Sequence, residues 1–97
     1  MPAYITLIKY TEQGVRTIKD TLKYQEEGTK RAEKMGAKFL GFYMTMGEYD
    51  AVAICECPSD EAAVAAGLAG SSDGNIRTTT LRAFTPKEFE EIISKLP

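Results

Sequence analysis

The sequence predicts an α+β fold of the ferredoxin-like type, an antiparallel sheet of four strands with two helices on one face. Two observations predict it. Strand-like and helix-like segments follow one another in the order βαββαβ, with a short C-terminal helix added. The acidic segment Gly47-Glu48-Tyr49-Asp50 lies between two apolar strand-like runs, where its glycine suits the turn of a hairpin. The chain of 97 residues has the length of a single domain, residues 1–97.

The first half begins with a strand and continues with a long helical segment. Ala3–Tyr10 is rich in β-branched and aromatic residues, which favour strands. Apolar residues then fall mostly at helical spacing, namely Val15, Ile18, Leu22, Ala32 and Met35. The polar stretch 25–28 interrupts this stripe, so we expect a main helix that begins at Asp20 or Thr21 after a looser first turn. Gly36 is expected to end that helix.

The central hairpin and a second helix come next. Residues 39–46 and 51–57 supply the two strands, and Pro58 closes the second one. Ser59 is expected to cap a helix that is dominated by alanine and runs to about Ala69. The glycine- and serine-rich segment 70–75 is a loop.

The last part of the chain is a strand followed by a short amphipathic helix. Ile76–Phe84 is the fourth strand, and Thr85-Pro86-Lys87-Glu88 is a capping box with proline at the first helical position. The apolar stripe of the helix consists of Phe89, Ile92, Ile93 and Leu96. The sequence leaves open whether this stripe covers the edge of its own sheet or reaches a neighbouring subunit.

Both faces of the predicted sheet carry apolar residues, although two helices cover only one face. An uncovered apolar face would exceed the patch that a monomer normally exposes, so we expect a homodimer in which two sheets pack face to face. The residues expected under the helices are Leu40, Phe42, Val52 and Ile54. The tyrosine, threonine and alanine residues of the strands would then face the dimer interior and line a cavity there.

Five segments, in this order along nearly the whole chain, carry a family resemblance: Tyr10–Gly14, Ile18–Asp20, Gly47–Asp50, Asn75–Thr78 and Leu81–Phe84. Together they resemble the GYD family of small bacterial and archaeal proteins, which has no assigned biochemical role. The resemblance implies a dimeric α/β barrel. Relatives of that fold include small monooxygenases, isomerases and the effector-binding domains of Lrp-type regulators. This chain departs from many members at Leu22 and Tyr24, where they have proline and arginine.

Seven polar side chains are candidates for ligand binding: Tyr4, Tyr43, Glu48, Tyr49, Asp50, Arg77 and Arg82. The tyrosines offer phenol groups to a ligand or to oxygen, or else they are packing residues with a satisfied hydroxyl. Asp50 and Glu48 are the acidic candidates. In one interpretation Asp50 acts as a base or binds an amine. In the other it accepts hydrogen bonds from backbone amides of the hairpin.

The two arginines offer a planar fork that suits a carboxylate ligand, or they pair with acidic residues of the protein. Side chains alternate between the two faces of a strand. Because Arg77 and Arg82 differ in parity, at most one of them enters a cavity.

The chain has no histidine, which excludes histidine-activated nucleophiles and histidine-based zinc or iron sites. Cys55 and Cys57 lie two residues apart on one strand, where a disulfide is geometrically disfavoured. Two thiols are also too few for a closed metal site. We therefore expect small buried cysteines, no metal and no cofactor. Met44 and Met46 are likewise expected in the core.

Charge and hydropathy limit the partners. The net charge of −2 gives no field that would collect nucleic acid, so no nucleic-acid partner is expected. No apolar run approaches the roughly 20 residues that span a bilayer, so no membrane association is expected. The first residues read as a strand rather than as a signal peptide, and we expect a cytoplasmic protein.

These features predict a homo-oligomeric small-molecule-binding or assembly domain. One alternative is a cofactor-independent enzyme, monooxygenase- or isomerase-like, that acts on a small hydrophobic or aromatic metabolite. Tyr43, Tyr49 and Asp50 would then carry orientation and proton transfer. The other alternative is a standalone effector-binding domain of the Lrp type. Sequence alone does not identify the ligand or decide whether the protein is an enzyme.

Overall fold

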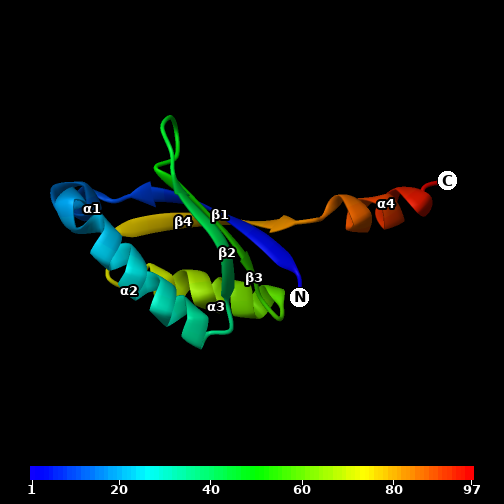
Figure 1. Cartoon of the computed structure of the whole chain (residues 1–97), viewed down its shortest axis with the longest axis horizontal. Coiled ribbons are helices and arrows are strands. Elements are labelled where there is room, and N and C mark those ends of the chain that lie inside the picture. The colour runs from blue at the N-terminus through cyan, green and yellow to red at the C-terminus, as the bar shows by residue number, and fades with distance from the viewer.

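The structure, a computed structural model, describes residues 1–97, and its elements follow the predicted order (Figure 1). They are β1 (Ala3–Tyr10), α1 (Glu12–Arg16), the 3-10 helix η1 (Ile18–Asp20), α2 (Thr21–Lys34), β2 (Lys38–Met44), β3 (Ala51–Glu56), α3 (Asp60–Gly70), β4 (Ile76–Ala83) and α4 (Pro86–Ser94). The four strands form one antiparallel sheet in the order β2-β3-β1-β4. The ferredoxin-like prediction is confirmed.

The predicted helix signals act through identifiable hydrogen bonds. Ser59 caps α3 by accepting a hydrogen bond from a first-turn amide, and Thr85 and Glu88 form the capping box of α4. Asp20 precedes α2 without a side-chain cap, because the chain already turns there through η1. Gly36 follows α2 with φ +98°, a conformation that glycine adopts without steric cost.

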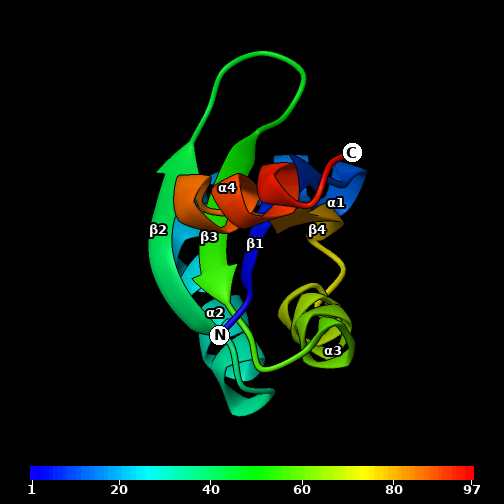
Figure 2. The ribbon, with the colours of Figure 1, turned by 90° about the vertical axis from the view of Figure 1, so that its right-hand side faces the viewer.

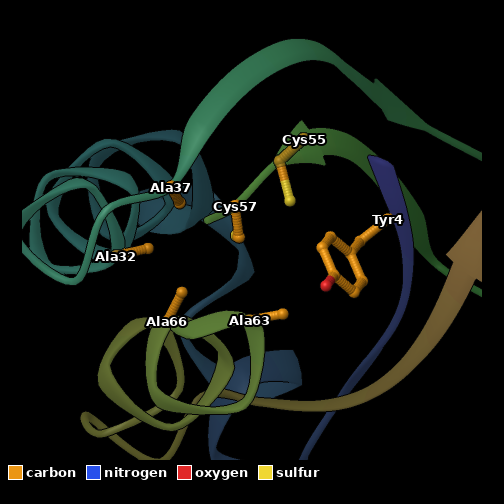
Figure 3. Packing of buried hydrophobic residues seen from close by; sticks show 7 residues of the cluster. All are labelled: Tyr4, Ala32, Ala37, Cys55, Cys57, Ala63 and Ala66. Atoms are coloured by element: carbon orange, nitrogen blue, oxygen red, sulfur yellow. The ribbon is translucent and has the colours of Figure 1, made fainter. Parts of the chain in front are cut away.

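The core lies between the sheet and the helices α2 and α3, which cover one face of it (Figure 1). Figure 3 shows side chains from both layers converging in the larger cluster, Tyr4, Ala32, Ala37, Cys55, Cys57, Ala63 and Ala66. A smaller cluster is formed by Ile8, Ala51 and Ala53. Small residues dominate the larger cluster, and glycine and alanine on the facing sides of α2 and α3 let these two helices lie close together.

Of the four residues that we expected under the helices, only Phe42 lies there. In β3 the buried residues are Ala51, Ala53 and Cys55, whereas Val52 and Ile54 lie on the opposite face. The small side chains of β3 therefore face the helix layer and the cavity beneath it, and its larger side chains point away. Tyr4 also lies under the helices, with 3% of its surface exposed, and not in a dimer interior.

The apolar stripe predicted for the first helical segment does not face the sheet either. Ala32 is buried, but its other members remain between 43% and 67% exposed: Val15, Ile18, Leu22 and Met35. The two methionines expected in the core are exposed as well. Met44 ends β2, and Met46 lies in the loop of the hairpin, beyond the reach of the helices.

Two apolar surfaces remain uncovered. The first is the open sheet face, the side of the sheet away from α2 and α3, which carries Ile5, Leu7, Leu40, Tyr43, Val52, Ile54 and Leu81. The second is the stripe of α4. This helix has no buried residue and extends away from the rest of the molecule (Figure 1), so that it lies in front of the sheet in Figure 2. The chain has no helix with the length and apolar character that a bilayer span requires.

Candidate functional site

A cavity of about 90 Å3 lies between the sheet and the helix layer. Phe39, Phe42, Ala51 and Ala53 give it an apolar wall on the sheet side. The cavity therefore lies inside one subunit, on the opposite side of the sheet from the position that we expected. It combines apolar walls with converging polar groups, which is the usual composition of a ligand site.

The inner face of α2 supplies most of the polar groups. Thr21, Tyr24, Gln25, Gly28 and Thr29 line the cavity, and their spacing of three and four residues places them on one side of the helix. The side-chain amide of Gln25 donates to the Thr29 hydroxyl at 3.0 Å. In the sequence, this polar side of α2 appears as the interruption of the apolar stripe at residues 25–28.

The edge strand β4 adds hydroxyl groups below α3. A Cβ on Gly67 of α3 would come 3.7 Å from the Thr78 hydroxyl and 3.9 Å from the Thr80 hydroxyl. The bare backbone at Gly67 thus leaves both hydroxyls uncovered. Five hydroxyls that line the cavity form no hydrogen bond within the protein, namely those of Thr6, Thr21, Tyr24, Thr78 and Thr80. Each of them can bond a ligand or water.

The only charged side chain in the wall is Asp73, and it is already paired. Arg31 approaches its carboxylate at 3.2 Å and also donates to the backbone oxygens of Ala69 and Gly70, at 2.7 and 3.1 Å. The pair ties the end of α3 to α2. It also leaves the cavity without an unpaired charge.

The segment around Asn75 closes one end of the site. Asn75 is buried and accepts a hydrogen bond from the side-chain amide of Gln13 at 2.9 Å. The amide of Thr11 donates to the Asn75 backbone oxygen at 3.0 Å, and the Thr11 hydroxyl donates to that of Gly74 at 2.7 Å. These bonds join the start of α1 to the start of β4.

Tyr4 is the one predicted candidate that lines this cavity. Its phenol donates a hydrogen bond to a carboxylate oxygen of Asp60 at 2.6 Å. That hydrogen bond, followed by burial, raises the pKa of Tyr4 to about 12. Tyr4 therefore acts as a neutral, positioned phenol at ordinary pH, and its hydroxyl is already occupied.

Arg82 lies next to Tyr4 but outside the main cavity, in an open hollow with Asp60 and Thr80. Its guanidinium lies 5.7 Å from the Tyr4 ring centre and 4.5 Å from that of Phe84. It also approaches the Glu88 carboxylate at 3.7 Å and donates to the backbone oxygen of Ala3. These contacts occupy the guanidinium group of Arg82, which we had considered as the binding group for a carboxylate ligand.

The remaining candidates lie outside the cavity. Tyr43 is on the open sheet face, and Arg77 lies opposite Lys9 across β1 and β4. At the hairpin tip, the Lys9 amine is 3.9 Å from the Glu48 carboxylate and 5.2 Å from the Tyr49 ring centre. None of these four candidates shares a site with Tyr4.

Asp50 extends the contact between the hairpin and β1. Its carboxylate accepts a hydrogen bond from the amide of Tyr10 at 2.8 Å, and its own amide donates to the backbone oxygen of Ile8 at 2.8 Å. Its partner is thus a strand amide, not an amide of the turn itself. Asp50 does not line the cavity.

Both cysteines are free and buried. Cys55 lines the cavity, and burial together with the neighbouring Cys57 raises its pKa to about 12. Burial also raises the pKa of Cys57. Both thiols therefore stay protonated and weakly nucleophilic near neutral pH. No three acidic or cysteine side chains gather closely enough to hold a metal ion.

Comparison with known proteins identifies the family of the chain and shows similar proteins, two of which are described here. The family model described as "GYD domain" matches residues 4–93. A protein of Thermus thermophilus, named glutamine synthetase and cystathionine beta-lyase binding protein, is 29% identical over 84 residues, which are 86% of this chain and 88% of the relative. The crystal structure of the methylated RPA0582 protein is similar with a TM-score of 0.47 and 17% identity, covering 88% of this chain and 82% of the other.

Proposed function

Because the chain belongs to the GYD domain family and encloses a cavity with apolar walls and unpaired hydroxyls, we propose that it is a small-molecule-binding domain. The observation that carries the proposal is the polar inner face of α2. A helix that covers a sheet normally turns its apolar residues inward. Here Tyr24 and Gln25 face the cavity while Leu22 is 67% exposed. A helix that turns its polar side toward the sheet stabilises the fold less well, but its polar groups can bind a ligand.

The chemistry of the wall indicates a small neutral ligand. Asp73 is paired with Arg31, so a charged ligand would find no counter-ion and would lose its hydration. Phenylalanine and alanine side chains suit an apolar or aromatic ring. The free hydroxyls of Thr78 and Tyr24 suit a carbonyl, hydroxyl or amide group on that ring.

A comparison of neutral and charged probes tests this proposal. We expect phenol and benzamide at millimolar concentration to raise the melting temperature and to give ligand-observed NMR signals, and benzoate to do neither. Thr78→Val removes one hydroxyl from the cavity and should weaken the binding of benzamide about threefold to tenfold. Thr79→Val is the matched control, because Thr79 is the next residue of β4 and points to the other face. Equal effects of the two variants would contradict the assignment.

The enzyme alternative is not supported by the positions of its residues. It assigned orientation and proton transfer to Tyr43, Tyr49 and Asp50, and all three lie outside the cavity. Binding without chemistry, as in an effector-binding domain, fits the neutral hydroxyls that line the site. Turnover of a bound probe would reinstate the catalytic hypothesis with other residues.

We infer a second role in assembly, in which two copies pack through the open sheet face. The chain has 6642 Å2 of accessible surface, whereas a compact monomer of this mass has about 5,500 Å2. The excess of about 1,100 Å2 exceeds the roughly 800 Å2 that each partner contributes to a stable interface. The Thermus relative is itself named for the binding of two other proteins.

Sedimentation velocity tests the assembly at micromolar concentration. We expect the mass of two or more chains for the native protein. Val52→Lys places a charge in the middle of the open sheet face and should give single chains. Ser72→Lys is the control, because Ser72 is exposed in the loop before β4. A native protein that sediments as a single chain would contradict the self-association.

A further inference from the structure

We propose that α4 is an arm that packs its apolar stripe on the open sheet face of a second copy of the chain. This inference rests on the proposed self-association and adds the element that completes it. In the structure the arm extends past the end of β4, away from its own sheet (Figure 1). A radius of gyration of 14.6 Å, against about 13 Å for a compact chain of this length, reflects that extension.

The arm needs a partner surface in order to be stable. It is a helix of nine residues, and helices of fewer than roughly 12 residues are marginal in water without tertiary contacts. All four residues of its stripe are between 41% and 66% exposed, namely Phe89, Ile92, Ile93 and Leu96. An amphipathic helix with this stripe is expected to bury it.

The junction with β4 holds the arm away from its own open sheet face. The capping box fixes the first turn through hydrogen bonds between Thr85 and Glu88, at 2.9 and 3.1 Å. Arg82, on the helix side of the sheet, stacks on Phe84 and approaches the Glu88 carboxylate. Folding the arm back over the other side of the sheet would break the contact between Arg82 and Glu88, whereas the capping box would move with the arm.

The open sheet face of a second copy fits the arm in apolar character and in charge. Arg77 lies at the start of β4 next to Lys9, and no carboxylate pairs with it. Glu90, which flanks the apolar stripe of α4, has no basic partner. In a two-fold arrangement with antiparallel β4 strands, the arm of one copy comes to the Arg77 end of the other. The unpaired charges then meet, and the stripe covers apolar strand residues.

Mixed isotope labelling of the full chain tests the contact directly. We expect nuclear Overhauser effects from the Ile92 and Ile93 methyl groups of a labelled copy to Leu7 or Val52 of an unlabelled copy. Ile92→Gln should weaken self-association at least tenfold, because a two-fold dimer loses the contact twice. Lys87→Gln, the same new residue on the polar side of α4, should leave it unchanged.

The outcomes separate this inference from the proposed functions. Self-association that Val52→Lys abolishes and Ile92→Gln leaves intact would overturn the arm while keeping the open-face assembly. A single-chain native protein, or an arm that contacts only a different protein, would overturn it too. In every case the titration with benzamide reports on the cavity independently, since Ile92 lies outside it.

Discussion

Gly28 of α2 and Gly70 of α3 lie against each other where the two helices pack. A Cβ on Gly28 would come 2.8 Å from the backbone oxygen of Gly70, closer than side chains approach backbone atoms in folded proteins. Gly28 is buried, and the oxygen that it faces also accepts a hydrogen bond from Arg31 at 3.1 Å. This contact sets the distance between the two helices that roof the cavity.

Gly28→Ala is therefore expected to destabilise the protein although alanine is the better helix former. The clash costs about 1–3 kcal/mol, and the gain in helix propensity returns up to about 1 kcal/mol. Urea unfolding should show a net loss of about 1–2 kcal/mol. Gly67→Ala is the control, because its Cβ meets nothing closer than 3.7 Å, and it should be neutral or slightly stabilising. A Gly28→Ala variant as stable as Gly67→Ala would contradict the close packing.

A second glycine fixes the closed end of the site. A Cβ on Gly14 would lie 2.1 Å from the backbone oxygen of Asn75, which also accepts the hydrogen bond from the Thr11 amide. Gly14→Ala should therefore separate α1 from the loop before β4 and cost about 3 kcal/mol, at the upper end of overpacking effects. Hydrogen exchange at the Thr11 amide should accelerate with it. Val15→Ala, one residue further on and exposed, should change neither measurement much.

The sequence predicted the strands and helix ends well because local signals determine them. The β-branched run of Ala3–Tyr10 and the capping box at Thr85 need no tertiary information, and both appear where they were predicted. Local signals do not determine which face of a strand lies under the helices. Val52 and Ala53 are both apolar, so hydrophobicity does not decide which one lies under the helices. Which face the helices cover decides it, and this requires the packed structure.

The position of the cavity was not predicted, because the residues of α2 that line it interrupt the apolar stripe of that helix. Gln25 and Gly28 interrupt an apolar helical stripe, and such an interruption ordinarily indicates a loop or a weak helix. The signal that was available is their spacing. Thr21, Gln25 and Gly28 repeat at four and three residues, which marks a continuous small and polar side of one helix. Reading polar periodicity alongside apolar periodicity would have found the site.

Asp50 is expected to stabilise the hairpin and to leave ligand binding unaffected. Asp50→Ala removes the acceptor for the Tyr10 amide and should cost about 1–2 kcal/mol in urea unfolding. Glu48→Ala is the control, because its ion pair with Lys9 spans 3.9 Å on exposed side chains and should contribute less than about 0.5 kcal/mol. Benzamide affinity should match that of the native protein in both variants. A selective loss of affinity in Asp50→Ala would instead make Asp50 a ligand residue.

The two buried thiols should react only after unfolding. Burial raises the pKa of Cys55 to about 12, so its thiolate is scarce at pH 8 in the native state. Disulfide reagents should therefore modify neither Cys55 nor Cys57 rapidly until urea is added. Thr78→Val, which keeps the fold, is expected to show the same protection. Fast modification of the native protein would show that the cavity opens to solvent on the time scale of the reaction.

The hydrogen bond between Tyr4 and Asp60 should make stability depend on pH in the alkaline range. The pKa of Tyr4 is about 12 in the folded chain and 10.0 in its ordinary state, so the folded protein holds this proton more tightly. The contribution is complete below pH 10 and is lost as the pH rises from 10 towards 12. Tyr4→Phe should remove this part of the alkaline decline, whereas the buried cysteines affect both proteins alike. Absorbance titration should show one of the five tyrosines ionising later than the others. A Tyr4 phenol that ionises near its ordinary pKa of 10.0 would contradict the bond.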